Sequence, residues 1–158
     1  MTDKVKISGI PPQYDQFELD RRVESWINVY RQTTQSMELV RSPLPHDLLQ
    51  QVIDKANDGY TLARSQPVSL APLNNSVWMV KPVAIQEEDI ANIRMEQKEK
   101  YIADLQVERE RYQGLLRQQL IQAKNEKEAR AAELAEAKKL EAIEREVQAC
   151  FKPLEIPE

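Results

Sequence analysis

Few residues of this chain could carry out chemistry, and the most suggestive are His46 and Asp47, which stand side by side. A His–Asp pair can orient a general base or a metal ligand, but either role needs further partners. The sequence has no second histidine, no CxxC pair and no GxSxG turn. We therefore interpret His46 as a surface residue in the first turn of a helix.

The remaining chemical candidates are equally isolated. Three glycines, Gly9, Gly59 and Gly114, stand too far apart to form a phosphate-binding loop. The single cysteine, Cys150, ends a helical apolar pattern, where a packing role is more typical than nucleophilic attack. Carboxylates are plentiful, but on a solvated helix nothing would separate the pKa values of neighbours, as acid–base catalysis requires. We expect no enzyme activity and no catalytic, cofactor or metal site.

The segment Pro11-Pro12-Gln13-Tyr14 matches the PPxY pattern that WW domains bind in a polyproline conformation. Such a short pattern also arises by chance, and a proline stop before a helix would use the same residues. Both interpretations stay open at this stage.

The largest predicted element is one long charged helix over residues 85–150. No proline occurs between Pro82 and Pro153, Gly114 is the only glycine there, and most other residues are good helix formers. Unbroken, such a helix would be roughly 95 Å long at 1.5 Å per residue. Three carboxylates at positions 87–89 should lie in its first turn, where the helix dipole favours them.

The apolar residues of this helix follow an eleven-residue step, which gives a nearly straight stripe suited to one seam of a coiled-coil-like contact. The stripe changes phase near Asn125. A solitary solvated helix, or a hairpin that turns near Gly114 or Asn125, would be the alternatives. The expected seam residues are Ile90, Tyr101, Leu105, Tyr112, Leu116, Leu120, Leu134, Leu140, Ile143 and Val147.

Residues 13–84 are expected to form a small α-rich head. One helix should span residues 15–40, with Asp15 as its N-cap and Glu18 completing a capping box. Thr33-Thr34 weakens its middle, so it could also stop there and resume at Ser36. A second helix should span residues 46–57 and pack antiparallel to the first. Its expected buried face consists of Leu48, Leu49, Val52, Ile53 and Ala56.

The pattern changes to period two at about residues 67–83, which predicts a β-hairpin turning at Asn74-Asn75. A two-stranded ribbon alone is marginal in water, so it must pack on the helices or pair with another segment. We expect Trp78 to anchor it and Trp26 to be buried with it.

Both ends are predicted to be extended. Residues 1–12 form an arm that could lie on a neighbour, add an edge strand or simply fray. Residues 151–158 contain two prolines and form a tail with three apolar residues, Phe151, Leu154 and Ile156. We interpret this tail as a docking peptide, or alternatively as a loose terminus.

The composition excludes some classes of function. The 158 residues carry a net charge of −4, which argues against a protein that binds nucleic acid by neutralising phosphates. Basic residues are also too sparse around the two short helices for a helix-turn-helix. No apolar run approaches 18 residues and the N-terminus has no signal region, so we expect no membrane insertion and a soluble, cytoplasmic protein.

The sequence thus predicts a mainly α protein, with two helices and a short β-hairpin followed by one long coiled-coil-like helix. The function that fits is non-enzymatic assembly: a homo-oligomer, or a protein docked on another protein, serving as a scaffold, adaptor or attachment component of a larger particle such as a phage virion. The alternative is an acidic helical regulator that binds and blocks an enzyme of a host or partner.

Overall fold

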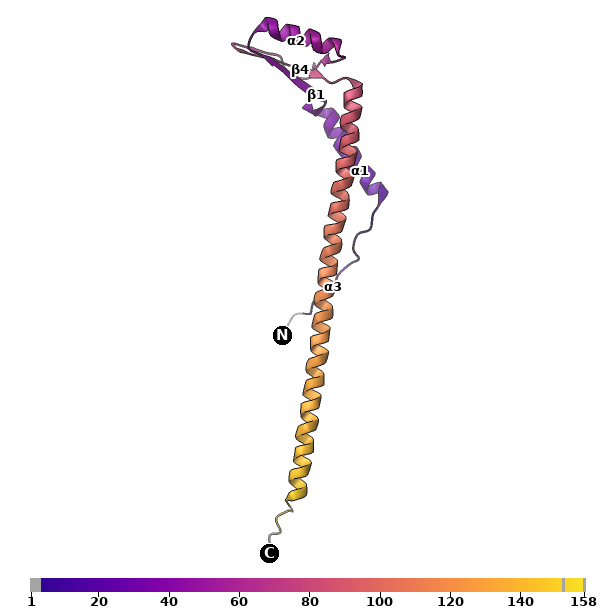
Figure 1. The fold of residues 1–158 in the computed structure, drawn as a ribbon, viewed down its shortest axis with the longest axis vertical. Coiled ribbons are helices and arrows are strands. Elements are labelled where there is room, and N and C mark those ends of the chain that lie inside the picture. The colour runs from indigo at the N-terminus through magenta and orange to yellow at the C-terminus, as the bar shows by residue number, and fades with distance from the viewer. Residues whose placement is uncertain (1–3, 152, 158) are drawn as a thin grey trace. The chain divides into compact units, whose positions relative to one another are not determined.

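The computed structural model describes residues 4–151 and 153–157, and Figure 1 shows its elements. In chain order they are α1 (Gln16–Gln32), the 3-10 turn η1 (Thr34–Ser36), β1 (Met37–Ser42), α2 (Pro45–Asn57), β2 (Thr61–Leu62), β3 (Ser69–Ala71), β4 (Asn74–Val80) and α3 (Val83–Cys150). The chain divides into two compact units. The first is Gln13–Gln106, and the second joins the N-terminal segment that ends at Pro12 to the residues from Val107 onward.

The first unit contains an antiparallel sheet with β4 at its centre. Strand β1 pairs with β4 from Met37 opposite Val80 to Ser42 opposite Asn75. Strands β2 and β3 both pair with β4 as well, at its two ends, so they share its other edge. The sheet therefore has more strands than the predicted hairpin.

One face of the sheet is covered by α2, and the core lies between them. Val77 and Met79 alternate along β4 on this face and are 5% and 1% exposed. Val40 of β1 and Leu48 of α2 complete the buried cluster. Burying each such aliphatic side chain contributes roughly 1.5–3 kcal/mol, so this cluster stabilises the packing of α2 on the sheet.

The prediction that the first helix continues to Val40 is wrong, because the helix stops at Thr33, where a break was the alternative, and no α-helix resumes at Ser36. Helix α1 ends at Gln32, and the Thr33 hydroxyl accepts a hydrogen bond from the Gln35 backbone N–H. The residues that follow form strand β1, and their apolar spacing also fits a helix, which explains the error. The predicted antiparallel helix pair is wrong too, because α2 packs on β1 and β4.

The predicted hairpin exists between β3 and β4, but its turn lies two residues earlier than expected. Ala71 pairs with Asn74, so Pro72-Leu73 forms the turn, with Leu73 at φ 58°. Asn75 is buried instead, and its side-chain amide donates hydrogen bonds to the carbonyl oxygens of Ser42 and Pro43. Its polar group therefore ties β4 to the end of β1.

Helix α2 was placed correctly, and Gly59 follows it with φ +94°, a conformation that favours glycine. Its buried face is narrower than predicted. Leu48 is buried, whereas Leu49 and Ile53 are 59% and 54% exposed and Ala56 is also exposed. A helix lying on one side of a small sheet buries only the stripe that faces the strands, so the flanking apolar residues remain in solvent.

Helix α1 is capped as predicted, but without a capping box. The Asp15 carboxylate accepts from the Phe17 backbone N–H at 3.0 Å. Glu18 does not return a bond to the cap, because its carboxylate binds the guanidinium groups of Arg21 and Arg22. These two ion pairs hold the pKa of Glu18 well below its usual value, at about 2.

The expectation that both tryptophans are buried is wrong for Trp26, which is 46% exposed. Three other residues of α1, Leu19, Ile27 and Tyr30, form its buried side. Trp26 lies at the margin, with the Lys100 ammonium 5.7 Å from its ring centroid. Trp78 is half-buried on the sheet, opposite Leu39 in the strand register.

Helix α3 is longer than predicted and unbroken. It starts at Val83, so the carboxylates at positions 87–89 lie beyond its first turn and the predicted dipole contact is wrong. It passes Gly114 and Asn125 without interruption, which overturns the hairpin alternative. Within residues 4–151 and 153–157, no helix is long and apolar enough to span a membrane.

Candidate functional site

The predicted seam residues of α3 differ in exposure along the helix. Tyr101 is buried, and Ile90, Leu105 and Tyr112 are half-buried. The remaining members are 46–63% exposed: Leu116, Leu120, Leu134, Leu140, Ile143 and Val147. The structure therefore does not present the ten residues as one continuous free stripe.

Tyr101 contacts the start of α1 within its own unit. Its hydroxyl oxygen accepts a hydrogen bond from the Asp15 backbone N–H at 3.0 Å. The Tyr14 ring lies 5.6 Å from its ring, and the Arg22 guanidinium lies 4.8 Å above it. Arg22 also forms an ion pair with Asp104 at 2.8 Å, which fastens the same turn of α1 to α3.

A second set of polar contacts holds the start of α3. The Asp89 carboxylate accepts from the Tyr30 hydroxyl at 2.6 Å and from the Lys81 ammonium at 2.8 Å. Burial alone would raise the pKa of Asp89, but these two hydrogen bonds outweigh it and hold that pKa below its usual value. Burial and the neighbouring Asp89 carboxylate raise the pKa of Tyr30.

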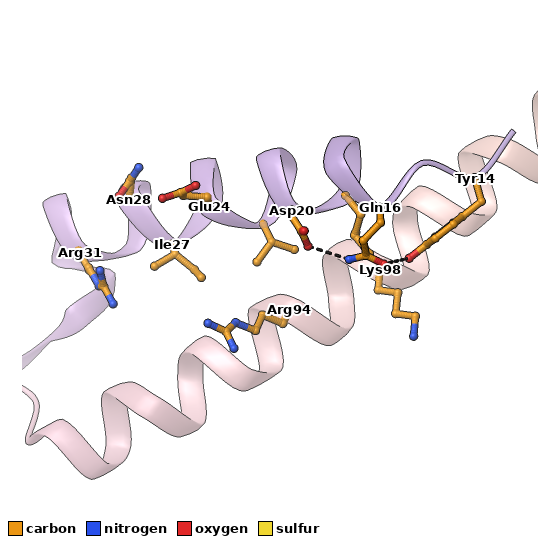
Figure 2. A pocket seen from close by; sticks show the side chains of 11 residues that line it. Tyr14, Gln16, Asp20, Glu24, Ile27, Asn28, Arg31, Arg94 and Lys98 are labelled. Carbon is orange, nitrogen blue, oxygen red and sulfur yellow. Dashed lines mark hydrogen bonds between the residues drawn. The ribbon is translucent and has the colours of Figure 1, made fainter. Parts of the chain in front are cut away.

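A groove of about 600 Å³ runs between α1 and α3 in this unit (Figure 2). Leu19, Val23 and Ile27 are its apolar residues. Its polar lining mixes both signs of charge, and the charged members are Asp20, Glu24, Arg31, Arg94 and Lys98. Such a mixture selects no class of charged ligand. Sequence reasoning missed this groove, because it depends on how two distant helices meet.

The N-terminal arm lies along α3 in the second unit. The Val5 backbone N–H donates to the Gln122 side-chain oxygen at 3.1 Å, and the Tyr112 hydroxyl donates to the Ser8 carbonyl oxygen at 3.3 Å. The arm therefore runs antiparallel to the helix. We predicted an extended arm, but nothing in the sequence indicated that Gln122 would bind it. Residues 1–3 of the predicted arm lie outside the described residues.

From Lys127 to Cys150 every residue of α3 is exposed. This stretch includes the late members of the predicted seam, of which Leu134 and Leu140 are 63% and 62% exposed. The tail continues this exposure. Its three apolar residues are 77–90% exposed: Phe151, Leu154 and Ile156. Lys152 and Glu158 of the predicted tail lie outside the described residues. We define the exposed helix Lys127–Cys150 as the C-terminal seam segment.

The structure also shows the surroundings of the other residues that could carry chemistry or bind a partner. His46 and Cys150 are exposed. Among the described residues, no group of three or more His, Cys, Asp or Glu side chains could hold a metal ion. In the PPxY segment the prolines are exposed, whereas Tyr14 is 50% exposed and packs on Tyr101. Its hydroxyl donates to Gln16 at 2.7 Å, so this tyrosine already has partners in its own unit.

Comparison with known proteins found no matching protein-family model, no matching curated protein and no matching solved structure.

Proposed function

We propose that this chain is a non-enzymatic assembly protein that self-associates through the C-terminal seam segment of α3. The observation that carries the proposal is the exposure of every residue from Lys127 to Cys150, including four large aliphatic residues. These four are Leu134, Leu140, Ile143 and Val147, and they are 46–63% exposed.

The magnitudes favour pairing over a solitary helix. Within this segment the Arg145 guanidinium binds Glu141 at 2.7 Å, and an exposed pair of this kind contributes roughly 0.2–0.5 kcal/mol. Fully burying one leucine, isoleucine or valine side chain contributes roughly 1.5–3 kcal/mol. Isolated helices are marginal in water, and most helical stability in proteins comes from packing an apolar face. A second helix would supply that packing.

Charge complementarity supports a second copy of this chain, parallel and in register. If Leu140 and Val147 occupy a positions and Ile143 and Cys150 occupy d positions, Lys139 lies at g and Glu144 at e. In a parallel pair, Lys139 of one chain then faces Glu144 of the other. If the two helices instead packed antiparallel with the same apolar residues in contact, Glu144 of one chain would face Glu144 of the other, and Glu146 would face Glu146. These like charges would repel each other. The apolar seam positions are Leu140, Ile143, Val147 and Cys150, and the charged positions that flank them are Lys139, Glu144 and Glu146.

The experiment is sedimentation equilibrium of the full chain over a range of concentrations, with the variants Leu140→Asp and Ala142→Asp. These two positions lie about 200° apart around the helix, so only Leu140 faces the seam. An aspartate in the seam must be desolvated without a partner, which costs several kcal/mol, whereas one on the outer face stays in water.

We expect the wild type and Ala142→Asp to form the same oligomer and Leu140→Asp to remain monomeric at the same concentrations. A wild type that stays monomeric throughout would overturn self-association. Equal association of all three proteins would show that the seam lies on another face.

The balance of charge on α3 argues against the alternative of an acidic regulator. Between Gln86 and Gln148 there are 15 acidic and 12 basic residues, a difference of three negative charges. An acidic helix could block an enzyme by imitating the charge of a nucleic acid, and that would need a larger excess of negative charge. By analogy with other proteins built on a long helix, we further propose a role as a scaffold or attachment component of a larger particle, assembled in the cytoplasm.

A further inference from the structure

We infer that the N-terminal arm occupies part of the face on which a second copy's α3 would pair, and so restrains self-association to the C-terminal seam segment. This inference rests on the proposed self-association. It concerns a different stretch of α3, from Arg109 to Gln122, where the arm of the same chain is already bound.

The arm is fitted to the helix rather than loosely laid on it. Val5 and Ile7 are half-buried, whereas Lys4 and Lys6 between and beside them are exposed. This alternation is typical of an extended segment with one side on a surface. The two hydrogen bonds at Val5 and Ser8 fix both its position and its direction.

Gly9 shows how close the fit is. Its φ is +85°, a conformation that side chains other than glycine rarely adopt. A Cβ atom at this position would lie 3.2 Å from the Tyr112 hydroxyl oxygen. A larger residue would therefore strain the backbone and push the arm away from Tyr112, the residue that holds Ser8.

The bound arm and the predicted seam share residues. An apolar groove of about 300 Å³ is lined by Ile7, Gly9 and Pro11 of the arm and by residues of α3 that include Tyr112 and Leu116. Both helix residues belong to the predicted seam. One face of a helix cannot contact two segments at once, so pairing along this stretch requires the arm to leave. Pairing over residues 134–147 does not, because the described arm residues reach no further along α3 than Val5, which lines a hollow with residues up to Ala129.

The consequence is a two-stage association. With the arm bound, two copies pair over the C-terminal seam segment alone. With the arm released, the pairing can extend toward Tyr112 and becomes tighter. The arm therefore sets the affinity of the assembly, and each copy must give up its own arm before the longer seam can form.

The test measures the self-association constant of the full chain by sedimentation equilibrium for the wild type and three variants. Gly9→Val should displace the arm through strain, and Tyr112→Phe should remove the hydroxyl bond to Ser8 while keeping an aromatic ring in the seam. Lys6→Ala alters an exposed arm residue and is the control.

We expect Gly9→Val to tighten association about tenfold, Tyr112→Phe to tighten it several-fold and Lys6→Ala to leave it unchanged. One lost hydrogen bond of about 1 kcal/mol corresponds to several-fold in an equilibrium constant. Hydrogen exchange at the Val5 amide reports arm release directly, and it should become faster in Gly9→Val.

Two results would overturn the inference and are distinguishable. If Gly9→Val releases the arm, as exchange at Val5 would show, but associates no more tightly than the wild type, the arm does not compete with pairing. If wild type, Gly9→Val and Tyr112→Phe all remain monomeric at every concentration, self-association itself fails, and the inference fails with it.

Discussion

At the scale of single residues, polar side chains fasten α1 to α3 at both ends of their contact. Tyr101 receives the start of α1 through the Asp15 backbone N–H, and Asp89 receives its end through the Tyr30 hydroxyl. Tyr101 had been predicted to face another chain, because its spacing fits the apolar stripe. Its position shows that an aromatic residue with the spacing of a seam can pack against another element of its own chain.

Asp89 makes the stability of the first unit dependent on pH. Its pKa in the folded state lies below the usual value of about 4, because of the bonds from Lys81 and Tyr30. A lowered folded pKa means that the unfolded state binds more protons in this range, so stability falls as the pH falls. The contribution is fully present above about pH 4 and is lost below it, as the pH passes through the lowered folded pKa.

We therefore expect Asp89→Asn to lower the free energy of unfolding at pH 7 and to make its loss between pH 5 and about pH 3 smaller than in the wild type. Urea titrations followed by tryptophan emission measure this, because Trp26 and Trp78 both belong to the first unit. Glu88→Gln changes an exposed neighbouring carboxylate and is the control. An acid dependence in Asp89→Asn as steep as that of the wild type would contradict the assignment.

At the scale of elements, the sequence predicted what local chemistry determines. Helix α2 has a proline at its start and a glycine after its end, and α3 consists of good helix formers, so both were placed correctly apart from the first residues of α3. Strand β1 was missed because Met37 and Val40 continue the helical spacing of α1. Only the pairing with β4, far away in the sequence, makes them a strand.

The position of the turn and the position of the arm were missed for the same kind of reason. Asn74-Asn75 has the side chains of a turn, yet Asn75 is needed to bind the Ser42 and Pro43 carbonyls, and Leu73 takes the positive φ instead. The arm's place on α3 depends on Gln122, a polar residue that no apolar pattern marks. The late seam residues, by contrast, were predicted from their spacing alone; they are exposed in the structure, and their role as a seam stays a prediction.

Adjacent leucines on α2 test the architecture of the sheet and its helix. Leu48 is 4% exposed and belongs to the core, whereas Leu49 is 59% exposed. We expect Leu48→Ala to lower the free energy of unfolding by about 2–5 kcal/mol, through lost burial and the cavity left behind. Leu49→Ala should change it by less than about 0.5 kcal/mol. Both are measured by urea unfolding; equal losses would mean that α2 lies on the sheet with a different face.

At the scale of the whole molecule, the two units have different sources of stability. The first unit, Gln13–Gln106, has a buried cluster between α2 and the sheet and polar ties between α1 and α3. The second contains an arm on one stretch of α3, and beyond it a helix whose residues are all exposed. Packing within the chain therefore stabilises the first unit, but it contributes almost nothing to the stability of the C-terminal seam segment.

This difference predicts two unfolding transitions that respond differently to protein concentration. Tryptophan emission reports only the first unit, so its thermal midpoint should not change with concentration. Circular dichroism at 222 nm also reports the C-terminal seam segment of α3, whose helix depends on a second copy under the proposed self-association. By mass action, a folded state that is an oligomer becomes more stable as concentration rises. The helical signal should therefore contain a phase whose midpoint rises between micromolar and millimolar protein, and Leu140→Asp should abolish that rise without moving the tryptophan midpoint.

Coincident transitions at every concentration would mean that α3 melts with the first unit, and a concentration-independent helical phase would mean that the exposed seam is stable as a solitary helix.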